Sequence, residues 1–189
     1  MSSRSIGFIG GGRVARILLG GLKRAGASPT TCVVSDADTE VLENLATQFP
    51  EIHAAGADNS EPARQDLVFG ALHPPAMKDE LPQIGRHLRA ESVFVSRAPV
   101  IRIPALSSAL GGFDHVARMI PNAASVVGSG FNPIAMSDRL PARDKTDLVD
   151  WLRVFGECPE VADEDLEAYA ILTAMGPTYF WYQFEELER

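Results

Sequence analysis

A glycine-rich turn near the start of the chain places the strongest limit on its fold. Residues 5–15 read Ser-Ile-Gly-Phe-Ile-Gly-Gly-Gly-Arg-Val-Ala, so a short apolar run leads into Gly10-x-Gly12-x-x-Ala15. Apolar residues then recur at helical spacing. In such a unit Gly10 permits the tight turn, Gly12 lets the backbone approach a ligand, and Ala15 lets helix and strand pack closely. The pattern predicts a turn that binds a pyrophosphate at a helix N-terminus; the alternative is an ordinary glycine-rich turn.

Strands and helices alternate along most of the chain. The expected strands are Ile6–Ile9, Thr31–Ser35, Ile52–Ala54, Asp66–Leu72, Ser92–Ser96 and His115–Ile120. The expected helices are Arg13–Ala25, a stripe over residues 41–49 capped by Asp38, Ala76–Arg89 with Pro82 in its middle, and Ile103–Leu110. This alternation predicts an α/β fold, a doubly wound Rossmann-type and mostly parallel sheet with helices on both faces.

The pattern changes after Pro121. We expect a short strand within Val126–Ala135, a helix over Asp144–Phe155 and an edge strand at Pro159–Val161. The chain is helical again from residue 163, where an acidic run suits the positive end of a helix, and Gly176-Pro177 is expected to interrupt it before a helical segment at Thr178–Glu188. We predict a dinucleotide-binding Rossmann domain over residues 1–162. Residues 163–189 are then the shortened start of a helical dimerisation or substrate domain.

Charge and cysteine content exclude several classes of function. The net charge is −8, without a block of lysines or arginines, which argues against a nucleic-acid or anionic-membrane partner. No apolar stretch reaches the roughly 20 residues needed to cross a bilayer. Cys32 and Cys158 form no metal or redox pair, so we expect no metal and a reducing, cytoplasmic location. Backbone amides at a helix terminus still allow an acidic protein to bind an anionic cofactor.

Several polar side chains follow strands that are expected to be parallel. Because the carboxyl ends of such strands lie at one edge of the sheet, the glycine turn, Asp36, His73, Arg97 and Asn122 should line a common crevice. Asp36 is placed to contact the adenosine ribose, and an acid there slightly favours NADH because it repels a 2′-phosphate. A plain turn aspartate is the alternative, and a small residue such as Ser35 can also bind a phosphate.

The remaining candidates at this edge have ordinary alternatives. Arg97 is a candidate clamp for a substrate carboxylate, or a surface arginine. Asn122 is a candidate hydrogen-bond partner of a nicotinamide amide or of the substrate, or a turn residue after Pro121. His73 is a candidate to polarise a ligand or donate to the ribose near neutral pH, or a solvated histidine at a strand end.

Aromatic residues crowd into the C-terminal helical segment. They are Tyr179, Phe180, Trp181, Tyr182 and Phe184. The first turn of this segment is apolar nearly all round, which predicts one half of a homodimer interface, with packing inside the chain as the alternative.

Four further segments follow the glycine turn: Asp58-Asn59 with the strand after it, Arg118–Asn122, Val126–Gly130 and Gly176–Tyr179. Taken in this order, the turn and these segments resemble the pyrroline-5-carboxylate reductase family. The opening turn is similar to that family's strand–glycine–helix start, and Asp58-Asn59 with the strand after it resembles its asparagine loop and fourth strand. Arg118-Met119-Ile120-Pro121-Asn122 resembles its Arg-Val-Met-Pro-Asn stretch, Val126–Gly130 the segment that follows, and Gly176-Pro177-Thr178-Tyr179 its Gly-Pro-Ala-Tyr. Leu72-His73-Pro74 stands where the family has Lys-Pro, Pro99-Val100 where it tends to have Ala-Gly, and the chain ends at Arg189 where such reductases continue.

The resemblance implies an NADPH- or NADH-dependent imine reductase that acts on a small cyclic imino acid. It implies Asn59 as an amide contact to the cofactor's ribose region, with an Asx turn or helix cap as the alternative. Two further functions stay open. One is a deazaflavin-linked NADP oxidoreductase or another small-substrate dehydrogenase with the same cofactor domain; the other is a dinucleotide-binding module that turns nothing over. The predicted catalytic residues are Asn122 and Arg97, and the predicted cofactor contacts are Gly10, Gly12, Arg13, Val14, Ser35, Asp36, Asn59, Leu72, His73 and Pro74.

Overall fold

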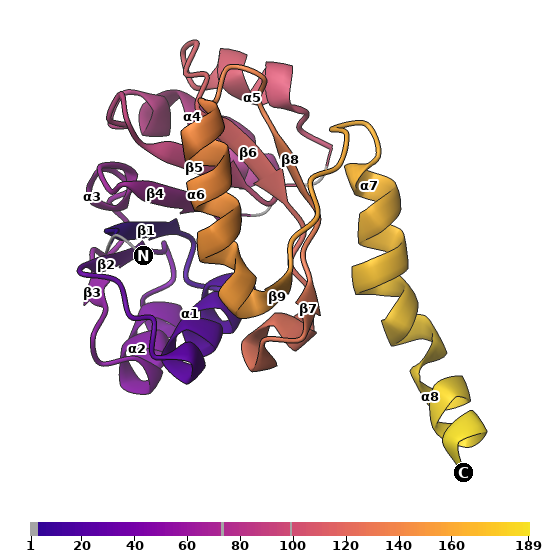
Figure 1. Cartoon of the computed structure of the whole chain (residues 1–189). Helices are drawn as coiled ribbons and strands as arrows, with labels where there is room; N and C mark the ends of the chain where they lie inside the picture. The colour runs from indigo at the N-terminus through magenta and orange to yellow at the C-terminus, as the bar shows by residue number, and fades with distance from the viewer. Residues whose placement is uncertain (1–3, 73, 99) are drawn as a thin grey trace.

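A seven-stranded sheet forms the centre of the molecule in a computed structural model that describes residues 4–72, 74–98 and 100–189. Its strands, in spatial order, are β3 (His53–Ala54), β2 (Cys32–Ser35), β1 (Ile6–Ile9), β4 (Leu67–Gly70), β5 (Val93–Ser96), β6 (Val116–Met119) and β8 (Ile134–Met136). All neighbouring pairs are parallel except β6 and β8. This order confirms the predicted doubly wound, mostly parallel α/β fold (Figure 1).

Helices cover both faces of the sheet because consecutive strand residues point to opposite sides. On β4, Leu67 and Phe69 belong to one apolar cluster and Val68 to the other. The first cluster also takes residues of α1 (Arg13–Ala25), α2 (Thr39–Gln48) and α6 (Ala142–Leu152). The second takes residues of α3 (Ser60–Ala63), α4 (Pro74–Gly85) and α5 (Ile103–Ala109). The strands are therefore covered on both sides, as their nearly continuous apolar sequence predicts.

Local sequence signals place two of the helix ends. The side chain of Asp38 accepts hydrogen bonds from the N–H groups of Glu40 and Val41, which confirms the predicted cap of α2. Helix α1 ends at Gly26, whose φ of 61° lies in the left-handed region that favours glycine. Pro82 does not interrupt α4, which runs through to Gly85; the proline is exposed, so water can reach the carbonyl that its missing N–H leaves unpaired.

The segment after β6 is broken into shorter elements than the sequence predicted. They are the 3₁₀ helix η1 (Ala123–Val127), β7 (Gly130–Phe131), the 3₁₀ helix η2 (Arg153–Phe155) after α6, and β9 (Gly156–Glu157), which pairs with β7. The expected edge strand at Pro159–Val161 is reduced to an isolated bridge between Glu160 and Ile134 of β8. The prolines at 133 and 159 lack N–H groups, and this limits how far a ladder extends here.

The C-terminal segment runs through three helical elements, α7 (Leu166–Tyr169), the π-helical stretch η3 (Ala170–Met175) and α8 (Gly176–Glu188). The expected interruption at Gly176-Pro177 is wrong, because a wider π turn precedes the proline and the helix continues. In an α-helix the carbonyl of Thr173 would accept from the N–H of residue 177, which Pro177 lacks. The side chain of Asn122 donates to this carbonyl instead, at 3.3 Å.

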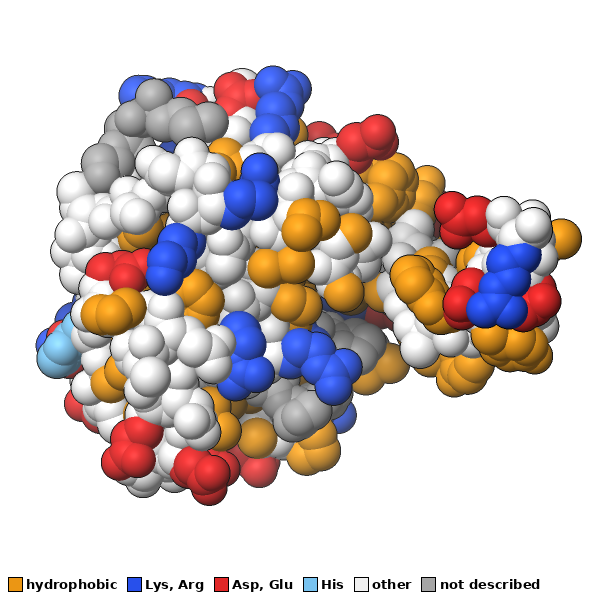
Figure 2. Space-filling model, turned by 90° about the horizontal axis from the view of Figure 1, so that it is seen from below, with side chains coloured by type: hydrophobic (Ala, Val, Ile, Leu, Met, Phe, Trp, Pro, Cys, Tyr) orange, Lys and Arg blue, Asp and Glu red, His pale blue; other side chains and the backbone are white. Residues whose placement is uncertain are grey.

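Helix α8 stands away from the sheet and buries none of its residues (Figure 1). Its apolar side chains gather on a rod that projects from the body and ends in charged residues (Figure 2). The expectation that this segment has an unpartnered apolar surface agrees with its exposed residues Tyr179, Phe180, Trp181, Tyr182 and Phe184. Within the described ranges, no helix combines the length and the apolar character that a bilayer crossing requires.

Candidate functional site: a glycine turn at the carboxyl edge of the sheet

The first turn of the sheet has the geometry that its glycines predict. Gly10 has a φ of 105°, which residues with a side chain rarely adopt, and its N–H donates to the carbonyl of Ser35 at 2.8 Å. A Cβ at this position would lie 2.9 Å from the carbonyl carbon of Ala71 and near the side chain of Leu72. The residues that follow β4 therefore pack directly against the turn, and the Leu72 side chain lies next to Gly10.

Gly12 differs from Gly10 because its surroundings are open. It precedes helix α1 in extended conformation, and a Cβ placed there would meet no described atom within 4 Å. Packing of the described residues therefore does not require glycine here, whereas a ligand against the backbone would. Among the described residues, no side chain caps the N-terminus of α1, and the first turn of this helix holds no acidic residue. Its N–H groups are free for an anion, and these features fit the diphosphate of a dinucleotide.

The two residues after Gly12 contribute in different ways. The side chains of Val14 and Ala15 are both buried in the apolar core, so the Val14 side chain is not available to a ligand. Arg13 is exposed on the first turn of α1. The structure therefore allows Arg13 to act through its charge and Val14 only through its backbone.

Asp36 lies directly beside the turn. One carboxylate oxygen accepts from the N–H of Gly11 at 2.8 Å, and the other accepts from the N–H of Asp38 at 2.9 Å. The carboxylate is thus fixed at the end of β2, next to the helix that begins at Arg13. Both bonds come from backbone groups, so its orientation does not depend on a flexible side chain.

Ser35 and Asn59 belong to a hydrogen-bonded chain behind Asp36. The buried hydroxyl of Ser35 donates to the amide oxygen of Asn59 at 2.7 Å, and the amide nitrogen of Asn59 donates to Glu80 of α4 at 2.9 Å. Glu80, which is half-buried, was not among the residues selected from the sequence, because nothing in the sequence of its helix distinguishes it from the neighbouring Asp79. The chain brings a second carboxylate toward the pocket expected for the adenosine ribose.

Arg97 directly follows β5 at the same edge, and its N–H donates to the carbonyl of Gly70 in β4 at 3.2 Å. Partial burial, and then the positive charge of Arg13, lower the pKa of Arg97. Within residues 4–72, 74–98 and 100–189, neither arginine forms an ion pair. Two cations near each other without a carboxylate fit an anionic ligand. His73 lies outside the described residues, and so does the side chain of Pro74.

Asn122 follows β6 and lies against the C-terminal segment. Its side chain donates to Thr173 of η3, and its amide oxygen is buried with no hydrogen-bond partner among the described residues. It borders a mostly apolar hollow of about 530 Å³ between the start of η1 and residues 173–181. The volume of the hollow would accommodate a small ring, and the buried amide oxygen of Asn122 is an unpaired acceptor in its wall.

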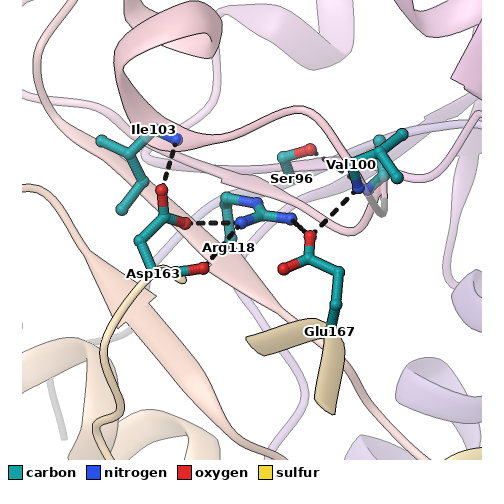
Figure 3. Close-up of polar contacts among 7 residues, drawn as sticks. Ser96, Val100, Ile103, Arg118, Asp163 and Glu167 are labelled. Atoms are coloured by element: carbon teal, nitrogen blue, oxygen red, sulfur yellow. Dashed lines mark hydrogen bonds and ion pairs between the residues drawn. The ribbon is translucent and has the colours of Figure 1, made fainter. Parts of the chain in front are cut away.

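A buried ion-pair cluster joins β6 to the C-terminal segment (Figure 3). Arg118 of β6 is only 1% exposed and contacts Asp163 and Glu167 at 2.5 Å each. The acidic run at residues 163–165 was expected to suit the positive end of its own helix, but no described side chain caps α7, and the side chain of Asp163 accepts from the N–H of Ile103, the first residue of α5. An arginine within an apolar strand was a signal for a buried acidic partner, but the sequence does not say which acid.

The carboxylate of Glu167 is held in its charged form. Burial alone would raise its pKa, but hydrogen bonds from Arg118 and the Val100 N–H, together with the charge of Arg118, lower the pKa below the ordinary value. A folded-state pKa below the unfolded one stabilises the fold above the unfolded pKa, and this contribution is lost as the pH falls through the folded pKa.

Acid is therefore expected to weaken the fold through this cluster. The free energy of unfolding, measured by urea titration, should decrease as the pH falls below about 4.3, the unfolded pKa of glutamate. Glu167→Gln should show a shallower decrease over that range, because it removes the titrating group. Glu164→Gln, an exposed acid of the same segment, should keep the wild-type slope. If the free energy of unfolding decreases with pH equally steeply in all three proteins, the Glu167 carboxylate does not contribute to the acid sensitivity of the fold.

Together, the sheet order, the open Gly12 and the free N-terminus of α1 define a dinucleotide-binding domain of the Rossmann type. A family model described as "NADP oxidoreductase coenzyme F420-dependent" matches residues 5–99, from the glycine turn to the loop after β5. The chain belongs to this family of NAD(P)-dependent oxidoreductases, and a nicotinamide dinucleotide as the cofactor is confirmed at the level of the family.

Proteins similar over nearly the whole chain are pyrroline-5-carboxylate reductases. Those of Corynebacterium melassecola and Escherichia coli are 28% and 27% identical over 97% of this chain and 68% of each relative. The solved reductase of Coxiella burnetii superposes with a TM-score of 0.86 at 25% identity, over 98% of this chain and 69% of that one. The Plasmodium falciparum pyrroline carboxylate reductase, solved with NADP bound, superposes with a TM-score of 0.84 at 20% identity, over 99% of this chain and 68% of that one. The resemblance is confirmed, and the chain spans about two thirds of these relatives' length.

Proposed function

We propose that this chain is a nicotinamide-dependent reductase that adds hydride to the C=N bond of a small cyclic imino acid, of the pyrroline-5-carboxylate type. The observation that carries the proposal is the turn at Gly12, open to ligand and flanked by free N–H groups, in a chain similar to such reductases over 97% of its length. The geometry supports the cofactor-binding part of the proposal most directly, because the glycine turn is formed by this chain alone.

The residues of the site have distinct proposed roles. N–H groups of Gly12, Arg13 and Val14 bind the diphosphate, and the charge of Arg13 adds to this attraction. The nicotinamide supplies the hydride when it is bound. Arg97 binds the substrate carboxylate as an ion pair, and the free amide oxygen of Asn122 accepts an N–H from the substrate or from the nicotinamide amide. Such a reaction needs orientation and exclusion of water more than a strong base.

The nucleoside end of the site favours NADH over NADPH. Asp36 presents a fixed carboxylate at the end of β2, and Asn59 brings Glu80 toward the same pocket. Two negative charges repel a 2′-phosphate, whereas the 2′-hydroxyl of NADH can donate to Asp36. The hydroxyl of Ser35 is used by Asn59, which leaves it less suited to bind a phosphate.

We therefore expect NADH to bind more tightly than NADPH, and Asp36→Asn to shift the ratio of the two dissociation constants by about tenfold toward NADPH. Asparagine keeps one oxygen that accepts from the N–H of Gly11, so the turn should be preserved, and the bond from the N–H of Asp38 is lost. Titration of cofactor fluorescence measures both constants. Glu43→Gln removes an exposed charge from the neighbouring helix α2 and should leave the ratio unchanged. A wild-type preference for NADPH would reject this assignment.

Turnover with pyrroline-5-carboxylate tests the reaction itself. The protein is incubated with the imino acid and each reduced cofactor, and oxidation of the cofactor is followed by absorbance. The family description raises a second candidate, hydride exchange between reduced coenzyme F420 and NADP, which the same assay with these two compounds detects. Turnover with the imino acid supports the proposal, and turnover only with the deazaflavin assigns the second reaction. A folded protein that binds dinucleotide and catalyses neither is a non-catalytic binding module.

The C-terminal rod provides a surface for a second copy of the chain. Its side chains Tyr179, Phe180, Trp181 and Phe184 are each more than half exposed, which a helix in water rarely sustains alone. We expect a homodimer formed through α8, and sedimentation of the full chain measures its mass. Trp181→Glu should shift the protein to the monomer, whereas Glu188→Gln at the charged end should not. If the wild-type protein sediments as a monomer, the proposed homodimer through α8 is contradicted.

A further inference from the structure

The loop after β5 contains a backbone conformation that its own sequence does not favour. Val100 has a φ of 67°, in the left-handed region, and it is the one non-glycine residue with positive φ among those described. A β-branched residue is poorly suited to this region, and the Val100 side chain is 71% exposed, so packing does not hold it there. Such strain persists only where other contacts impose it.

Two carboxylates from the C-terminal segment impose this conformation (Figure 3). Glu167 accepts from the N–H of Val100 at 3.1 Å, and Asp163 accepts from the N–H of Ile103 at 3.0 Å. The two N–H groups lie three residues apart, so both ends of this loop segment are held from outside it. The bonds span 67 and 60 residues of sequence and join the end of the sheet domain to the start of the C-terminal helices.

Arg118 gathers the two carboxylates. Its guanidinium donates to Asp163 and to Glu167, and Glu167 uses the same oxygen for Arg118 and for Val100. A buried ion pair is a poor way to add stability, because desolvation offsets much of the attraction. It does fix direction, since the forked donors of an arginine orient both acids at once. We call Arg118, Asp163 and Glu167 the clamp.

The clamp lies just beyond the residue proposed to bind substrate. Ser96 of β5 pairs with Arg118 of β6 in the sheet. The hydroxyl of Ser96 accepts from the N–H of Ala98, so this bond spans Arg97 in the sequence. The backbone of Arg97 is thus held next to β4 and β5, and the clamped residues 100–103 follow it in the chain. None of the three clamp residues forms a described contact with Arg97 itself.

We infer that the clamp consists of positioning residues that couple the C-terminal helical segment to the substrate-binding loop. When α7 is seated, Glu167 and Asp163 hold residues 100–103 and orient Arg97; when it is displaced, the loop relaxes and the carboxylate site is lost. This inference rests on the proposed function for the role of Arg97, whereas the coupling between segments stands on the hydrogen bonds.

Glu167→Ala tests the clamp in the full chain. Amide hydrogen exchange at Val100 and Ile103 should speed up at least about tenfold, and the KM for the imino acid should rise about tenfold with an unchanged dissociation constant for the dinucleotide. Glu164→Ala, in the same segment but outside the clamp, should change none of these. A merely structural role would lower stability without separating KM from cofactor binding.

A second substitution keeps the test decisive. Glycine adopts positive φ without strain. Val100→Gly, placed in the Glu167→Ala protein, should therefore lower the raised KM most of the way back to the wild-type value. Unchanged exchange at Ile103 in Glu167→Ala, or no recovery by Val100→Gly, would overturn the inference. If the wild-type protein does not turn over the imino acid, the proposed function fails, and the exchange rates still decide whether the C-terminal segment holds the loop.

Discussion

Gly12→Val is expected to abolish detectable dinucleotide binding and leave the fold intact. Apart from Gly12 and its two chain neighbours, no described residue has an atom within 4 Å of a Cβ at this position, and the φ of −69° is accessible to any residue. A valine side chain would therefore fit the protein, but it would fill the space in front of the first N–H groups of α1. Loss of diphosphate contacts should raise the dissociation constant at least about a hundredfold, equivalent to about 2.7 kcal/mol.

Calorimetric titration with NADH and NADPH measures this effect, and thermal unfolding without cofactor checks the fold. Ala25→Val is the matched control, since it adds the same side chain at the exposed other end of the same helix. The control should bind as the wild type does. Wild-type affinity in Gly12→Val would show that the dinucleotide does not approach this turn.

Arg118→Met is expected to cause the largest loss of stability among single substitutions at the clamp. Methionine fills a similar space, but it leaves Asp163 and Glu167 facing each other without a counter-charge. Removal of one partner from a buried ion pair typically costs about 3–5 kcal/mol. The two carboxylates are 18% and 33% exposed and can recruit water, so we expect about 3 kcal/mol, at the low end of that range.

Urea unfolding of the full chain measures this loss. Arg139→Met removes an exposed arginine that pairs with Asp114, and it should cost about 0–1 kcal/mol. The triple variant Arg118→Met, Asp163→Asn, Glu167→Gln should recover much of the loss, because it removes the unpaired charges together. A loss no larger than that of the control would mean that the clamp is hydrated and carries little of the stability.

The fold was predictable because its signals are local. Apolar strands of four residues alternate with amphipathic helices, and a parallel sheet follows from that order without knowledge of any contact. The glycine turn was predictable for the same reason, because Gly10 and Gly12 act through backbone geometry. The cap of α2 by Asp38 follows from its position before an apolar stripe.

The rest of the site depends on pairs that sequence does not specify. Glu80 reaches Asn59 across 21 residues, and Asp163 reaches Arg118 across 45, so neither partner could be chosen from spacing. The continuation of the helix through Pro177 depends on a π-helical stretch and on a side chain that donates to a free carbonyl. The domain boundary at residue 162, the roles of Arg97 and Asn122 and the homodimer stay predictions.

A crystal structure of the full chain with NADH tests the central claim most directly. The account predicts the diphosphate within hydrogen-bond distance of the N–H groups of Gly12, Arg13 and Val14, with the adenosine ribose against the carboxylate of Asp36. NADH bound elsewhere, or a turn that stays empty at saturating NADH, would contradict the account.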